Sequence, residues 1–136
     1  MGSLNLKIIY RFLGITAILN GFFMFIAFPF SFFNLEPEAW GILNAGVITL
    51  LIGLLLFTFN KPTNTNIHKK EGYLIVTLGW LTLSITGMLP YLLSGAIPSI
   101  TDAFFETISG YSTTGSSILI DIESMPKGIL FWRSAT

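Results

Sequence analysis

The sequence predicts an all-α membrane protein that combines transmembrane helices with a re-entrant pore helix and a filter loop. Hydrophobic residues make up 52% of the 136 residues and charged residues only 10%, whereas a soluble domain usually carries about 25% charged residues. Long uncharged stretches alternate with short charged ones. Between two apolar stretches lies a segment rich in hydroxyl groups and glycine, residues 101–117. These three features place the chain in a lipid bilayer and single out the polar segment.

Three uncharged stretches are long enough to cross a bilayer, which takes about 20 apolar residues in a helix. The charged residues that enclose them are Arg11 and Glu36, then Glu38 and Lys61, and finally Glu71 and Asp102. We therefore expect helices near 10–32, 39–59 and 72–93. In the second of these, small residues recur every four positions at Gly41, Ala45, Thr49 and Gly53. Such a face lets helices approach closely, so it predicts helix packing rather than an ion path.

The distribution of basic residues predicts the orientation of the chain. Lysines and arginines precede the first span and lie between the second and third, while loop 34–38 is acidic. Because Lys and Arg mark the cytoplasmic side, we expect a cytoplasmic N-terminus. The predicted organisation is a two-helix unit (1–60), a cytoplasmic loop (61–71) and a pore unit (72–136). His68 is expected to be a solvated residue of that loop.

Residues 99–110 predict a helix that enters the membrane without crossing it. Ser99 followed by Asp102 is typical of a capping box, and Asp102 is therefore expected to be a cap rather than a ligand. A helix from there to about Ser109 has roughly ten residues and a length of about 15 Å. Gly110 is expected to end it, because glycine accepts the left-handed conformation of helix ends.

The filter loop, residues 111–117, is expected to return outward as extended chain. In that conformation backbone carbonyls replace the hydration shell of an ion, and the negative end of the pore-helix dipole favours a cation there. We expect the carbonyls of Ser112, Thr113, Thr114 and Gly115 to coordinate the ion. Gly115 is expected to adopt backbone angles closed to other residues.

Further residues are candidates for supporting the filter. Glu106 is either a cation ligand or an anchor that holds the filter from behind, and its place on the helix favours the anchor. Gly110 and Ser116 are assigned to support as well. Asp121 and Glu123 either concentrate cations at the mouth or are solvated charges, and the second interpretation is favoured.

Several classes of function are excluded by composition and spacing. The net charge is zero, so there is no basic surface for nucleic acid. The chain has no cysteine, hence no thiol chemistry and no disulfides. The hydrolase pattern G-x-S-x-G is broken at Thr114, and no strand is expected before it. We expect neither an enzyme nor a bound cofactor.

Five short segments resemble the Trk/Ktr/HKT superfamily of potassium transporters, and within it the bacterial Trk potassium-uptake membrane subunits. The matching segments are residues 71–76, 87–91, 102–106, 109–115 and 129–133. The resemblance implies a pore of four helix–loop–helix repeats, each giving one filter loop with a central glycine, here Gly115. Thr113 and Thr114 would coordinate potassium through their carbonyls, with Ser112 and Gly115 adjoining.

The resemblance also implies partners and a location. These are a homodimer when the protein is full length, a cytoplasmic nucleotide-binding regulatory subunit and the bacterial inner membrane. Residues 72–136 would be the first pore repeat, truncated in its second helix, and the chain an N-terminal fragment. The expected function is potassium uptake, with potassium as the transported substrate. Two alternatives stay open: a pore-loop cation channel subunit of another family, and a non-conducting membrane scaffold.

Overall fold

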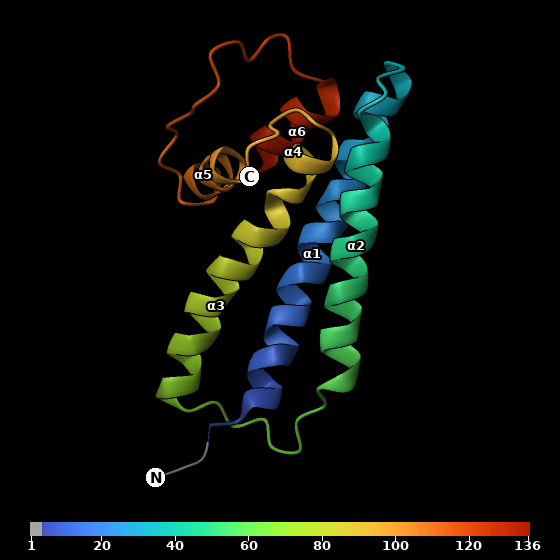
Figure 1. Ribbon diagram of the computed structural model, residues 1–136. Coiled ribbons are helices and arrows are strands. Elements are labelled where there is room, and N and C mark those ends of the chain that lie inside the picture. The colour runs from blue at the N-terminus through green and yellow to red at the C-terminus, as the bar shows by residue number, and fades with distance from the viewer. Residues whose placement is uncertain (1–3) are drawn as a thin grey trace.

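The computed structural model describes residues 4–136. Three long helices run side by side, and three short ones gather at one end of them (Figure 1). In chain order the helices are α1 (Leu6–Phe33), α2 (Ala39–Phe59), α3 (Lys69–Gly87), α4 (Leu89–Leu93), α5 (Ile100–Tyr111) and α6 (Lys127–Ala135). Segments Leu6–Phe33, Ala39–Phe59 and Lys69–Leu93 are long and apolar enough to cross a membrane. The predicted all-α membrane fold is confirmed.

Helices α1 and α2 form a close hairpin because glycines face each other across it. A Cβ atom on Gly53 would lie 2.8 Å from Ile18 N and 2.9 Å from Gly14 O. One on Gly14 would lie 2.7 Å from Phe57 N, so only glycine lets the two backbones approach this closely. The four small residues of the predicted stripe on α2 are all buried, which confirms that the stripe serves packing.

The helix boundaries follow local capping chemistry. Helix α1 begins at Leu6, earlier than predicted, because the Asn5 side chain accepts a hydrogen bond from Ile8 N. Helix α2 has the predicted bounds. The third span is interrupted at Met88, where Pro90 lacks the N–H that would continue the hydrogen-bond ladder. Gly95, at φ +76°, then reverses the chain toward α5.

The main core lies where the short helices pack against the hairpin. Its largest fully buried side chains include Met24 of α1, Ile42 of α2, Tyr91 of α4 and Trp132 of α6. The Trp132 ring also donates a hydrogen bond to the Gly87 carbonyl at 3.0 Å. The end of the molecule that holds the short helices is therefore fixed to both the hairpin and α3.

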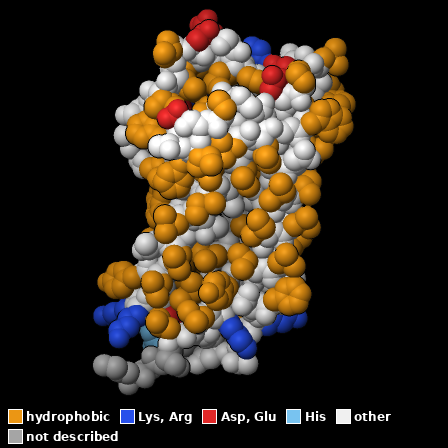
Figure 2. Space-filling model, in the orientation of Figure 1, with side chains coloured by type: hydrophobic (Ala, Val, Ile, Leu, Met, Phe, Trp, Pro, Cys, Tyr) orange, Lys and Arg blue, Asp and Glu red, His pale blue; other side chains and the backbone are white. Residues whose placement is uncertain are grey.

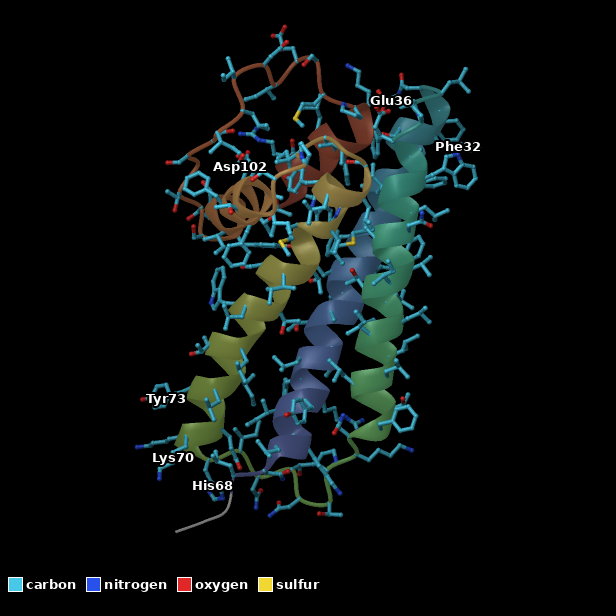
Figure 3. All side chains as sticks on the ribbon, in the orientation of Figure 1. Phe32, Glu36, His68, Lys70, Tyr73 and Asp102 are labelled. Carbon is cyan, nitrogen blue, oxygen red and sulfur yellow. The ribbon has the colours of Figure 1, made fainter. Side chains whose placement is uncertain are left out.

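Hydrophobic and charged side chains occupy different parts of the surface along the length of the helices. Hydrophobic side chains cover the flank, most lysines and arginines gather at the end that holds the N-terminus, and acidic residues gather mainly at the other end (Figure 2). His68 and Lys70 lie at the first end, with Tyr73 just inside it, while Glu36 and Asp102 lie toward the second (Figure 3). His68 is exposed, as predicted. This is the surface expected of a protein that spans a bilayer.

Candidate functional site

Helix α5 is too short to cross a membrane. Its 12 residues give a length of about 18 Å, against a hydrocarbon thickness of about 30 Å. The predicted N-cap is confirmed, since the Ser99 hydroxyl accepts a hydrogen bond from Asp102 N at 3.4 Å. Within residues 4–136 the Asp102 carboxylate makes no return bond to Ser99, so the capping box is incomplete. Aspartate is one methylene shorter than the glutamate typical of that position.

The prediction that Gly110 ends the pore helix is wrong. The helix continues through Tyr111, because Ser112 N, Thr113 N and Thr114 N bond to the carbonyls of the last turn. The left-handed residue is Thr113, at φ +57°. Gly110 instead lies where α5 approaches the end of α6, and a Cβ there would be 2.9 Å from Thr136 Oγ1.

The filter segment, which we define as Ser112, Thr113, Thr114 and Gly115, leaves the helix as exposed irregular chain. Among residues 4–136, none of its four backbone carbonyls accepts a hydrogen bond. Gly115 has φ +72°, the left-handed region that the sequence analysis expected of it. Free carbonyls next to the C-terminal end of a helix form an electronegative site that suits a cation.

The chain beyond the filter segment is held by the pore helix. The Ser109 hydroxyl donates to the Ser116 carbonyl. The Glu106 carboxylate accepts hydrogen bonds from Ser117 Oγ at 3.0 Å and from Ile118 N at 3.3 Å. Glu106 therefore binds residues 117 and 118, the chain that follows the filter segment.

Arg133 of α6 completes this arrangement. Its Nε lies 2.7 Å from Glu106 Oε1, and the Glu106 side chain is only 3% exposed. This pair was not predicted from the sequence. A signal was present, since an arginine in an apolar segment requires an acidic partner, and the facing short helix offers two, Asp102 and Glu106, of which Asp102 was already expected to be a cap.

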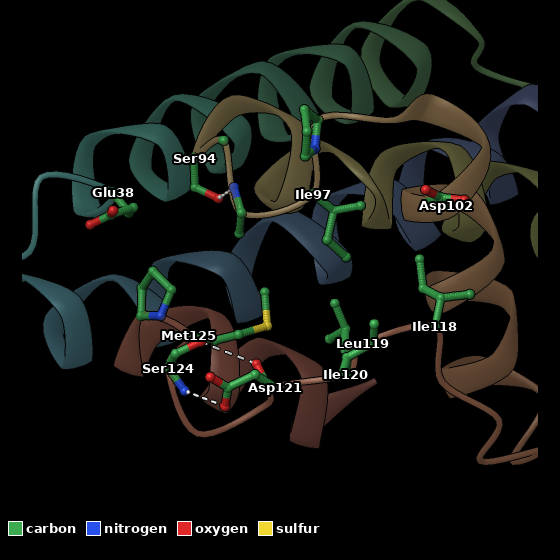
Figure 4. Close-up of a pocket in the computed structure, with 14 residues that line it drawn as sticks. Glu38, Ser94, Ile97, Asp102, Ile118, Leu119, Ile120, Asp121, Ser124 and Met125 are labelled. Atoms are coloured by element: carbon green, nitrogen blue, oxygen red, sulfur yellow. Dashed lines mark hydrogen bonds between the residues drawn. The ribbon is translucent and has the colours of Figure 1, made fainter.

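A pocket lies at the acidic end of the molecule, away from the filter segment. It has a volume of about 480 Å³ and is lined by Glu38, Asp102 and Asp121 among other residues (Figure 4). Asp121 accepts a hydrogen bond from Ser124 N at 3.3 Å within its own turn. Asp121 and Glu123 are both exposed, consistent with solvated charges.

Three comparisons with known proteins agree. Residues 40–136 match the TrkH family, described as cation transport protein. The chain is 41% identical over 87 residues to the Trk system potassium uptake protein TrkH of Escherichia coli (strain K12), covering 63% of this chain and 18% of that protein. Identity to the TrkH of Halomonas elongata is 31% over 131 residues, covering 96% and 27%.

The fold agrees as well. The crystal structure of the potassium transporter TrkH from Vibrio parahaemolyticus superposes with a TM-score of 0.88 at 28% identity, covering 96% of this chain and 28% of that one. The chain therefore spans between 18% and 28% of the length of these relatives.

Proposed function

Because this chain belongs to the TrkH family of cation transport proteins, we propose that it supplies one of four selectivity-filter loops to a potassium-uptake transporter. The observation that carries the proposal is the filter segment, whose four exposed carbonyls accept no hydrogen bond within residues 4–136. The names of the relatives, which are potassium uptake proteins, support potassium as the ion. The family is one of transport proteins, in agreement with the prediction that the chain is not an enzyme.

The proposed mechanism is the transfer of potassium from water to backbone carbonyls. Thr113 and Thr114 coordinate the ion, with Ser112 and Gly115 adjoining, and three further loops complete its shell. Glu106, Gly110 and Ser116 support the loop from behind. Inward movement of one positive charge gains about 2.3 kcal/mol per 100 mV of membrane potential, so uptake requires no chemical step.

The proposed setting is a bacterial inner membrane with the N-terminus in the cytoplasm. The separation of basic and acidic residues to opposite ends supports this orientation. A homodimer and a cytoplasmic nucleotide-binding regulatory subunit are proposed on the family resemblance.

A pair of glycine variants tests the filter assignment. Gly115 and Gly95 have nearly the same backbone angle, φ +72° and +76°, and a Cβ on either would meet nothing within 4 Å. Gly115→Ala and Gly95→Ala therefore carry a similar strain of about 1–2 kcal/mol. The variants are made in a complete transporter in which this chain replaces the matching residues of the Vibrio parahaemolyticus protein, expressed in cells that lack other potassium uptake.

We expect Gly115→Ala to lose most potassium uptake, or most discrimination against sodium, because the strain falls on the coordinating carbonyls. Gly95→Ala is expected to keep both at the same amount of protein in the membrane. Equal transport by the two variants would contradict the filter assignment and favour a scaffold role.

A further inference from the structure

We propose that Asn20 of α1 is a positioning residue that fixes the filter segment through Tyr111, an inference that rests on the proposed function. Tyr111 is the last residue of α5 and directly precedes Ser112. Its hydroxyl donates a hydrogen bond to Asn20 Oδ1. The N-terminal hairpin contributes no residue to the filter segment, yet through this bond it reaches the residue next to it.

The bond belongs to a polar chain that joins three helices. Asn20 Nδ2 donates to Thr86 Oγ1 of α3 at 2.7 Å, and Thr86 Oγ1 donates to the Thr82 carbonyl at 2.7 Å. Each group in this chain therefore donates a hydrogen bond to the next one, from Tyr111 through Asn20 and Thr86 to the Thr82 carbonyl. Since each group already has its partner, Asn20 is held in one orientation and presents its carbonyl oxygen to Tyr111.

The buried position of Asn20 would make an unpaired amide group costly there. Asn20 lies near the middle of α1 and is 4% exposed, so its amide lies at the depth where unpaired polar groups are most costly. Apolar packing would be served better by leucine at this position. The amide is satisfied there by two side-chain partners, the Thr86 hydroxyl and the phenol of Tyr111.

The Tyr111 ring is fixed on one side by packing and on the other by the hydrogen bond. A Cβ on Gly87 would lie 2.9 Å from Tyr111 Cε2, so α3 touches one side of the ring. A cavity of about 160 Å³, lined by Leu19 and Phe23 among others, opens beside the same ring. Without the bond to Asn20 the ring has room to move, and its backbone would carry Ser112 with it.

Three variants test the inference in the complete transporter described above: Asn20→Leu, Tyr111→Phe and the double variant. Potassium uptake is measured as half-saturating concentration and as selectivity over sodium, each normalised to folded protein. We expect either single variant to raise the half-saturating concentration by about fivefold, as for the loss of one buried hydrogen bond that orients a site. The double variant is expected to be no worse than the worse single one.

Thr49→Val is the matched control. Thr49 lies in the same hairpin, and its buried hydroxyl has no hydrogen-bond partner among the described residues. We expect this variant to leave half-saturation and selectivity unchanged. If the single variants lower only the amount of folded protein, the inference about Asn20 is overturned and the proposed function is not. The same holds if the double variant changes the half-saturating concentration by the product of the two single changes. A parent protein that moves no potassium would overturn the proposed function as well.

Discussion

The carboxylate of Glu106 holds the chain that directly follows the filter segment. It accepts hydrogen bonds from Ser117 and Ile118 and pairs with Arg133 from a different helix. A buried carboxylate with this many donors is stable only while the donors are present. The pair therefore links the position of α6 to the position of the filter loop, since moving one group leaves the other uncompensated.

Glu106→Gln is expected to lower the free energy of unfolding by about 3 kcal/mol, because it leaves the Arg133 guanidinium without its counter-charge. Arg133→Gln is expected to have a similar effect, as it leaves the buried Glu106 charge alone. The double variant Glu106→Gln/Arg133→Gln should recover part of the loss. Thermal unfolding of the complete transporter in detergent measures all three, and strictly additive losses would show that the two groups do not act as a pair.

Residue chemistry could be read from the sequence where it is local. The Ser99 cap and the left-handed Gly115 follow from properties of single residues and their neighbours, and both are found. The partners of Glu106 and Asn20 could not be predicted in this way. Arg133 is 27 positions from Glu106, and Tyr111 is 91 positions from Asn20, and no periodicity connects them. The end of α5 was missed because Thr113 accepts the left-handed conformation in place of Gly110.

At the scale of elements, α6 begins without a cap of its own. Its N-cap is Pro126, which makes no side-chain hydrogen bond to the helix. The missing acceptors come from the end of α1 and from the loop that follows it. Glu36 of that loop accepts from Lys127 N at 2.8 Å, and Ser31 Oγ in the last turns of α1 accepts from Gly128 N at 2.8 Å. The hairpin therefore caps the helix that carries Arg133, and a negative charge at this end also suits the helix dipole.

We expect Glu36→Gln to destabilise the protein by about 1 kcal/mol, the usual effect of weakening a helix cap. Glu38→Gln is the matched control, because this carboxylate is in the same loop and makes no side-chain cap bond. Chemical unfolding of the complete transporter in detergent compares the two variants with the parent. Equal losses would indicate that the loop responds to charge in general rather than to the cap.

Among the elements, the spans and the packing stripe could be predicted from the sequence, whereas the cap on α6 could not. The three spans were predicted because uncharged length alone decides whether a segment can cross a bilayer. The stripe of small residues on α2 correctly predicted close packing. The cap on α6 was not predicted, because Glu36 and Lys127 are 91 positions apart and meet only once the hairpin and α6 have packed together.

At the scale of the whole molecule, the distribution of charge and the position of the short helix α5 are consistent with one orientation in the membrane. Most lysines and arginines lie at the end with the N-terminus, with Lys127 and Arg133 the exceptions, and α5 lies at the opposite, acidic end (Figures 1 and 2). If the basic end is cytoplasmic, α5 lies in the outer half of the membrane, and its last residue, Tyr111, reaches Asn20 near the middle of α1. The proposed filter segment would then receive cations from outside, as the proposed uptake requires.

The absence of cysteine from the sequence allows a direct test of this orientation. Asn66→Cys and Glu123→Cys each place one thiol at an exposed position, at the basic and the acidic end respectively, in a complete transporter otherwise free of cysteine. A membrane-impermeant maleimide is expected to label Glu123→Cys in cells with an opened outer membrane, and Asn66→Cys only after the inner membrane is permeabilised. Val76→Cys, which is exposed on a spanning helix, should stay poorly labelled in both conditions, because its thiol faces lipid. The reverse pattern at the first two positions would place the filter loop on the cytoplasmic side, where it could not receive external potassium.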